Sequence, residues 1–182
     1  MNSSIAANTP QIRYQAPIFR SPSPEDGAAV HRLIADCPPL DPNSRYCNLL
    51  QCSHFSDTSI IAEIGPVIVA FISGYILPKN ENTLFIWQVA VADSARRQNI
   101  ATQMLLKLLL RPVCRNVRYL ESTVTDANIA SKTLFTKLAG NLGVPLKTSP
   151  LFTCDIHFDG QHSDEILYKI GPFSTSLLTI TT

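Results

Sequence analysis

Several residue types are scarce in this chain. Its 182 residues include 7 glycines, 2 methionines and one tryptophan, and only 16% are charged, with a formal net charge of +1. No apolar run approaches the roughly 20 residues that a membrane-spanning helix needs. The basic residues form no stripe of the kind that nucleic-acid-binding proteins show. These absences argue against a membrane protein or a nucleic-acid-binding protein, and the 45% hydrophobic content indicates a globular one.

Cysteines are present but lack the spacing of a metal or redox site. No Cys-x-x-Cys pair occurs, and the total of five is odd, which argues against a complete set of disulfides. Free thiols are typical of a reducing compartment, so a cytoplasmic location without a bound metal is expected. The cysteines are Cys37, Cys47, Cys52, Cys114 and Cys154.

The length fits one domain with a core of its own. Residues 1–15 lack both the basic start and the apolar segment of a signal peptide, and are expected to form a disordered leader. A single domain is predicted over residues 16–172, and a loose tail over residues 173–182.

Residue patterns predict strands and helices that alternate along the domain. Ser23, Pro24 and Asp26 have the spacing of a helix start with a capping box. Cys37-Pro-Pro39 ends that helix, because proline cannot continue the hydrogen-bond ladder. The order β-α-α-β-β-β-α-β-α-β-β favours an α/β fold in which helices cover both faces of a mixed sheet. Strands are expected at 16–20, 59–64, 67–77, 83–92, 117–124, 151–158 and 165–170, and helices at 24–37, 45–52, 98–110 and 125–139, the last capped by Thr125 or Asp126.

One strand-loop-helix unit, residues 87–101, suggests an anion site. The helix that begins near Gln98 presents unpaired N–H groups and the positive end of its dipole to the preceding loop. Such a site suits a pyrophosphate, and Arg96 and Arg97 add positive charge beside it. An ordinary surface helix preceded by a basic pair is the alternative interpretation.

The segment Arg96-Arg97-Gln98-Asn99-Ile100-Ala101 resembles the Arg/Gln-x-x-Gly-x-Gly/Ala motif of the GNAT acetyltransferases. Asn99 replaces the central glycine, and asparagine is the side chain that best tolerates a left-handed backbone. The resemblance implies the GNAT fold, with a mixed, mostly antiparallel sheet, and acetyl-CoA as the co-substrate. It also implies cofactor contacts from Gln88, Val89, Ala90, Val91, Arg96, Arg97, Gln98, Asn99, Ile100, Ala101 and Thr102.

A second segment, residues 128–137, resembles the GNAT pattern Asn-x-x-Ala-x-x-Leu-Tyr-x-Lys. The resemblance implies cofactor contacts from Asn128, Ser131 and Phe135. Phe135 stands where the family often has a tyrosine that protonates the leaving thiolate, and phenylalanine cannot donate a proton. Packing is therefore the favoured role of Phe135. Lys132 and Lys137 are interpreted as solvated helix residues, with contact to a CoA phosphate as the alternative.

Several strings together are similar to the diaminobutyrate acetyltransferases. They include residues 37–44, 85–91, 121–125 and 170–172, and the similarity extends from Phe19 to Pro172. The resemblance implies transfer of an acetyl group from acetyl-CoA to the 4-amino group of L-2,4-diaminobutyrate, in ectoine biosynthesis. It also implies a homodimer. Besides Asn99, a second departure is Arg97, where this family commonly has glycine.

The expected substrate has two amines and one carboxylate, so its site needs acids for the ammonium groups and a wall that sets the chain length. Glu121 is the candidate base, because a buried acid in a strand needs a reason. Trp87 offers a wall and a cation–π face, although a lone tryptophan also suits a core. Asp41 can bind an amine or only cap a turn. The remaining candidates for substrate contact are Asn43, Arg45, Tyr46, Thr123 and His162.

Two other functions remain open at this stage. A GNAT enzyme for another small amine would keep the cofactor motif without needing Asp41, Trp87 and Glu121 together. A module that binds acyl-CoA without turnover would accommodate Asn99 and Phe135.

Overall fold

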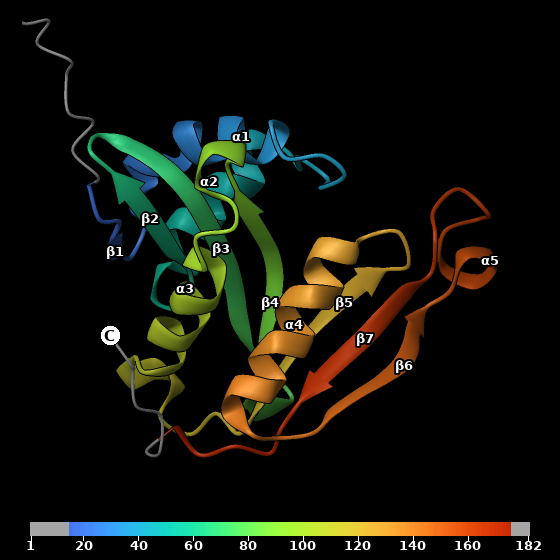
Figure 1. Ribbon diagram of the computed structural model, residues 1–182. Coiled ribbons are helices and arrows are strands. Elements are labelled where there is room, and N and C mark those ends of the chain that lie inside the picture. Colours follow the sequence, from blue (N-terminus) through green and yellow to red (C-terminus); the bar gives the residue numbers. More distant parts are fainter. Residues whose placement is uncertain (1–14, 176–182) are drawn as a thin grey trace, which may run out of the picture.

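A seven-stranded sheet with the strand order β1-β2-β3-β4-β5-β7-β6 forms the centre of the structure, a computed structural model that describes residues 15–175 (Figure 1). Only the β4–β5 pair is parallel, and the other five pairs of neighbouring strands are antiparallel. The expected mixed, mostly antiparallel sheet is therefore confirmed. The strands are β1 (Ile18–Arg20), β2 (Ile60–Ile64), β3 (Val67–Leu77), β4 (Asn80–Val91), β5 (Tyr119–Thr125), β6 (Leu146–Phe152) and β7 (Glu165–Ile170).

Helices cover both faces of the sheet (Figure 1). A core that includes Ile34 and Phe71 packs between one face and the first two helices, and a larger core that includes Leu105 and Leu138 fills the other face. The helices are α1 (Gly27–Ala35), α2 (Arg45–Ser53), α3 (Ile100–Leu109), α4 (Ile129–Leu142) and the short α5 (Cys154–His157). Short 3-10 turns lie at η1 (Pro24–Asp26), η2 (Ser56–Thr58), η3 (Asp93–Ala95) and η4 (Pro112–Cys114).

The parallel strands β4 and β5 stay together over only four residue pairs. Their register runs from Thr83 opposite Tyr119 to Ile86 opposite Ser122. Beyond this point β4 continues to Val91 and β5 to Thr125, but the two strands no longer pair with each other and they diverge (Figure 1). A β-bulge at Trp87 coincides with the divergence, since Gln88 pairs with Ser73 and Ile86 pairs with Gly74. Bulges bend a strand and increase its twist, so this one accounts for part of the splay.

The predicted starts of two helices need correction. The N-cap of α4 is Asn128, whose side chain accepts a hydrogen bond from the N–H of Ser131 at 3.0 Å, and not Thr125 or Asp126. Thr125 cannot cap the helix, because it still pairs with Glu165 in the sheet. Helix α3 begins at Ile100 rather than at Gln98, because Asn99 has a φ of 61°. The predicted capping box of the first helix is present, with the N–H of Ser23 donating to Asp26 at 2.7 Å.

The predicted strand at 151–158 is wrong in its position. Strand β6 ends at Phe152, and the following residues form α5. β6 is an edge strand that is exposed along most of its length, so it lacks the apolar alternation that marks a half-buried strand. Its pairing with β7 defines it instead.

The packed region continues one residue past the predicted boundary at 172. Phe173 is buried, and its N–H donates to the carbonyl of Arg118 at 2.9 Å. Residues 1–14 of the predicted leader and 176–182 of the predicted tail lie outside the described residues. Within residues 15–175 no helix is long and apolar enough to cross a bilayer. All five cysteines are free.

Candidate active site

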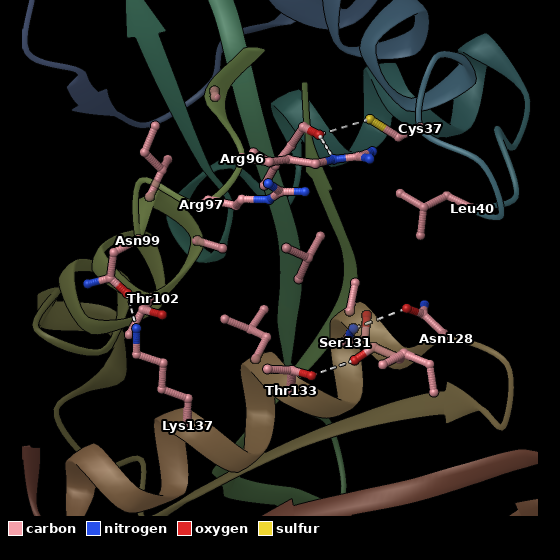
Figure 2. A pocket seen from close by; sticks show the side chains of 18 of the residues that line it. Cys37, Leu40, Arg96, Arg97, Asn99, Thr102, Asn128, Ser131, Thr133 and Lys137 are labelled. Carbon is pink, nitrogen blue, oxygen red and sulfur yellow. Dashed lines mark hydrogen bonds between the residues drawn. The ribbon is translucent and has the colours of Figure 1, made fainter. Parts of the chain in front are cut away.

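The N-terminus of α3 opens onto a cavity of about 530 Å³ (Figure 2). The cavity lies among four segments: the open end of β4, the loop before α3, the first turns of α4 and the loop that follows α1. Predicted cofactor contacts that line it are Val89, Val91, Arg96, Arg97, Asn99, Ile100, Ala101, Thr102, Asn128 and Ser131.

Two residues before α3 have a left-handed backbone. Asn99, the N-cap, has φ 61° and ψ 14°, and Arg97 has φ 62°. At these two positions the acetyltransferases that the sequence resembles have glycine, the residue that adopts a positive φ without steric cost. Asparagine adopts it readily, whereas an arginine loses free energy there, of the order of 1–2 kcal/mol. The loop before α3 therefore keeps the left-handed conformation at both positions, although neither residue is glycine.

Positive charge gathers around this helix start. Arg96 and Arg97 extend toward the cavity from the loop, and Lys137 lies across from them on α4 (Figure 2). The ammonium group of Lys137 donates to Oδ1 of Asn99 at 2.9 Å, and Arg96 pairs with Asp93. Because the helix N-terminus itself attracts anions, the end of the cavity beside α3 suits phosphate groups.

The open edge of β4 brings backbone groups to the cavity. The N–H of Ala92 donates to Val69 on β3 at 2.8 Å. Since N–H groups alternate along a strand, those of Val91 and Val89 point to the opposite side, where β5 has diverged. The carbonyl of Val91 on that side accepts from Sγ of Cys37 at 3.4 Å and from Nε of Arg96 at 3.1 Å (Figure 2). The N–H groups of this edge are therefore placed to polarise a carbonyl oxygen of a ligand.

Four of the predicted cofactor residues do not line the cavity. Ala90 is fully buried against α1, and Phe135 is buried in the larger core with its ring 6.3 Å from that of Tyr168. Gln98 turns back to the carbonyl of Ser94, and Gln88 lies on the other face of the sheet. For Ala90 and Gln88 the reason is strand alternation, which sends their side chains away from the face to which Val89 and Val91 belong.

That other face holds three of the candidate substrate residues, Glu121, Thr123 and Trp87. Glu121 on β5 lies opposite Phe85 on β4, so their side chains share a face. Phe85 packs on Tyr75 with ring centroids 5.4 Å apart, and Tyr75 contacts Trp87 edge-on at 6.3 Å. Trp87 is 43% exposed, so it is not a core residue. Aromatic rings and an acid beside one another suit an ammonium group.

A hydrogen bond from Gln88 attaches the loop after α1 to β4. The Nε2 group of Gln88, a residue that is 7% exposed, donates to the backbone carbonyl of Asp41. Asn43, with φ 56°, returns its N–H to Oδ1 of Asp41 at 2.9 Å, which makes a tight turn. Pro38, Pro39 and Leu40 of the same loop line the cavity. The loop thus borders the cavity and also the face of the sheet that carries Trp87, Gln88 and Glu121, which we call the acidic face.

Glu121 has an internal partner. Its carboxylate is 2.7 Å from the ammonium group of Lys169, which lies directly opposite on β7. The side chain of Glu121 is 10% exposed and that of Lys169 36%. Burial of this acid is therefore offset by an ion pair, which the sequence did not reveal because the two residues lie 48 positions apart.

The remaining candidates are less enclosed. Thr123 follows Glu121 on the same face of β5, whereas Arg45 and Tyr46 are exposed at the start of α2. His162 lies in the loop before β7, where its ring packs on Phe158 at 4.6 Å and Nδ1 contacts the carbonyl of Ser163. Among the described residues no contact joins His162 to Glu121 or Asp41.

Some lining residues were not among the predicted site residues. Lys137 was interpreted as a solvated helix residue, with contact to a CoA phosphate as the alternative. It is exposed and also lines the cavity, about two and a half turns after Asn128. The loop residues Cys37 to Leu40 belong to a string similar to the family, but no site role was predicted for them, because their place beside the cavity depends on how α1 packs on the sheet. Further lining residues are Ala95, Ile129, Ala130, Thr133 and Leu134. Within residues 15–175 no three His, Cys, Asp or Glu side chains cluster as metal ligands.

Known proteins are similar to this chain in sequence and in fold. The Acetyltransferase (GNAT) family matches residues 28–140. The L-2,4-diaminobutyric acid acetyltransferase of Methylotuvimicrobium alcaliphilum is 51% identical over 152 residues, which are 84% of this chain and 88% of the relative. The enzyme of that name from Vibrio cholerae is 46% identical over 164 residues, 88% of this chain and 95% of the relative.

A solved structure agrees with these relatives. The diaminobutyrate acetyltransferase of Paenibacillus lautus, in complex with its substrate L-2,4-diaminobutyric acid and coenzyme A, matches with a TM-score of 0.84 and 43% identity. The match covers 87% of this chain and 96% of that one. At this identity and coverage, the chain belongs to the diaminobutyrate acetyltransferase family within the GNAT superfamily.

Proposed function

We propose that this protein transfers the acetyl group of acetyl-CoA to the 4-amino group of L-2,4-diaminobutyrate, giving N4-acetyl-L-2,4-diaminobutyrate for ectoine biosynthesis. The observation that carries the proposal is the double role of β4. Val89 and Val91 line the cavity, while Trp87 and Gln88 on the same strand face the acidic side with Asp41 and Glu121. A donor and an amine held on the two sides of this strand end can react directly, without a covalent enzyme intermediate.

The cavity fits acetyl-CoA by its chemistry. The helix start at Asn99 and the side chains of Arg96, Arg97 and Lys137 provide a positive site for the diphosphate. Asn128 and Ser131 line the same cavity on α4 and are proposed contacts of the pantetheine arm. The thioester then lies along the open edge of β4, where the N–H groups of Val89 and Val91 stabilise charge that develops on the carbonyl oxygen.

Substrate recognition is proposed for the acidic face. Glu121 and Asp41 supply negative charge for the two ammonium groups, and Trp87 supplies the wall that limits chain length. Asn43, Tyr46, Thr123 and His162 are proposed polar contacts. Arg45 remains a candidate donor to the substrate carboxylate.

The attacking amine must lose a proton, and Glu121 is the proposed acceptor. Phe85 lies beside Glu121, and Val89 lies four residues further along β4, roughly 13 Å at 3.3 Å per residue. A glutamate side chain does not extend over this distance, so the proton passes from the amine to Glu121 through water. The CoA thiolate leaves without an acid from Phe135, whose ring is buried in the core.

The test is release of CoA from acetyl-CoA with L-2,4-diaminobutyrate, with ornithine, lysine and no amine as controls. We expect rapid release with diaminobutyrate and acetylation at N4 by NMR. Release only with another amine would support a different GNAT substrate. CoA binding without release for any amine would support a non-catalytic acyl-CoA-binding module.

We propose further that the protein is a cytoplasmic homodimer. Five free thiols fit a reducing compartment. The end of the β6–β7 hairpin carries exposed apolar side chains, Leu151, Phe152 and Ile156, the last 79% exposed. Apolar groups gathered on a projecting hairpin are typical of an interface. Light scattering at two protein concentrations tests the dimer, and a monomer at both would overturn it.

A further inference from the structure

We propose that Lys169 binds the carboxylate of the amino-acid substrate and so determines that the enzyme accepts an amino acid rather than a simple diamine. This inference rests on the proposed function. It concerns the end of the substrate that does not react.

Lys169 belongs to the acidic face by its register. It lies directly opposite Glu121 on the neighbouring strand, and Glu121 lies opposite Phe85. Opposed residues of paired strands direct their side chains to the same face. The ammonium group of Lys169 is therefore on the face where Phe85, Tyr75 and Trp87 form the aromatic wall.

The Lys169 ammonium group is held in place by Glu121 and still has N–H donors for a ligand. It contacts Oε1 of Glu121 at 2.7 Å and lies 4.6 Å from the ring centroid of Tyr119. An ammonium group has three N–H donors, and among residues 15–175 only Glu121 accepts a hydrogen bond from this one. The side chain is 36% exposed, so a small ligand can reach it.

The pair matches the charges of an α-amino acid. A diaminobutyrate molecule carries an ammonium and a carboxylate on one carbon atom, and the face presents a carboxylate and an ammonium side by side. The pair lies roughly 13 Å along the sheet from Val89, on the side away from the acetyl donor. The substrate therefore directs its amino-acid end toward Glu121 and Lys169 and its 4-amino group toward the thioester.

Two other basic residues provide comparisons. Lys147 lies opposite Lys169 on the edge strand β6, where it is exposed and takes no part in an ion pair among the described residues. Arg45 is exposed at the start of α2, close in sequence to Asp41, and is the rival donor for the substrate carboxylate.

The experiment compares L-2,4-diaminobutyrate with 1,3-diaminopropane, which has both amines and no carboxylate. We expect Lys169→Met to lower kcat/KM for diaminobutyrate about 10- to 100-fold, the range for a hydrogen bond between charged groups. The value for 1,3-diaminopropane should fall by a smaller factor, because both substrates lose the ion-pair partner of Glu121 but only diaminobutyrate loses a carboxylate contact. Lys169→Arg should restore most of the discrimination, and Lys147→Met should leave both substrates unchanged.

The opposing outcomes are distinct. An equal loss on both substrates in Lys169→Met and Lys169→Gln, with thermal unfolding and CoA binding as checks of the fold, would show a purely structural role for the ion pair and overturn the inference. A selective loss for diaminobutyrate in Arg45→Met but not in Lys169→Met would also overturn it. If the wild-type protein does not acetylate diaminobutyrate at all, the proposed function itself is wrong.

Discussion

The side-chain amide of Gln88 donates to the backbone carbonyl of Asp41, and this bond fastens the loop after α1 to the strand that carries the open backbone edge. Its other amide atom, Oε1, is buried without a partner among the described residues. Gln88 thus holds one loop that contributes to both sites. Pro38 to Leu40 of this loop line the cofactor cavity, and Asp41 of the same loop is a candidate contact of the amine substrate. Such coupling predicts that a change at Gln88 affects both substrates.

Gln88→Leu should raise KM for acetyl-CoA and for the amine together. The substitution keeps the volume but removes the donor to Asp41, and a neutral hydrogen bond contributes about 0.5–1.5 kcal/mol, or roughly 3- to 10-fold. Steady-state kinetics with each substrate varied in turn measures the effect. Gln88→Glu, which cannot donate when ionised, should be worse, and unchanged KM values in Gln88→Leu would contradict the coupling.

Asn99→Ala should destabilise the protein relative to Asn99→Gly by about 1 kcal/mol, because alanine at a φ of 61° has a steric cost that glycine lacks. Both variants lose the hydrogen bond to Lys137, so their difference isolates the backbone conformation. Urea unfolding of the two variants measures it. Equal midpoints would show that the loop can adopt another conformation.

Arg97→Gly should bind CoA more weakly while unfolding at a higher temperature. Glycine removes the cost of an arginine at a φ of 62°, and the cavity loses one guanidinium group. We expect a loss of affinity of roughly 3- to 10-fold at low salt that shrinks as salt is added, because exposed charges are screened. Calorimetric titration at two ionic strengths measures the loss. Arg97→Lys is the matched control, since it keeps both the charge and the backbone cost. If Arg97→Gly bound CoA as tightly as the wild type, Arg97 would have no part in the phosphate site.

Asp26→Asn should make the free energy of unfolding depend less on pH in the acidic range. Hydrogen bonds from Arg20 lower the pKa of Asp26 below its usual value near 3.8. A carboxyl whose pKa is lowered in the folded state contributes stability above its unfolded pKa, and this contribution is lost as the pH falls through the folded value. At pH 7 the variant should lose on the order of 1 kcal/mol, and below about pH 4 it should approach the wild type as the carboxyl of the wild type becomes protonated. Thermal unfolding from pH 7 to pH 3 tests this, with the exposed Asp36→Asn as control. A constant difference at every pH would exclude an ionic contribution.

The sequence predicted most elements with nearly correct bounds because local rules decide them. Pro-Pro39 ends the first helix, glycine and proline mark the turn at residues 65–66, and long apolar runs define β3 and β4. β6 was misplaced because both of its faces are exposed, which leaves no alternation to read. The start of α4 was misplaced because Thr125, Asp126 and Asn128 are all residue types that cap helices. The pairing of Thr125 with Glu165 and the hydrogen bond from Ser131 to Asn128 decide the position.

By itself, the sequence determined the order of the elements, the basic loop before α3 and the family, since these depend on residue type and spacing along the chain. Only the tertiary structure decided which side of β4 each residue faces, because a bulge at Trp87 changes the alternation along the strand. It also decided the partners of the candidate acids. Glu121 meets Lys169, and Asp41 meets Gln88, because strand register and helix packing bring together residues that are separated by more than forty positions.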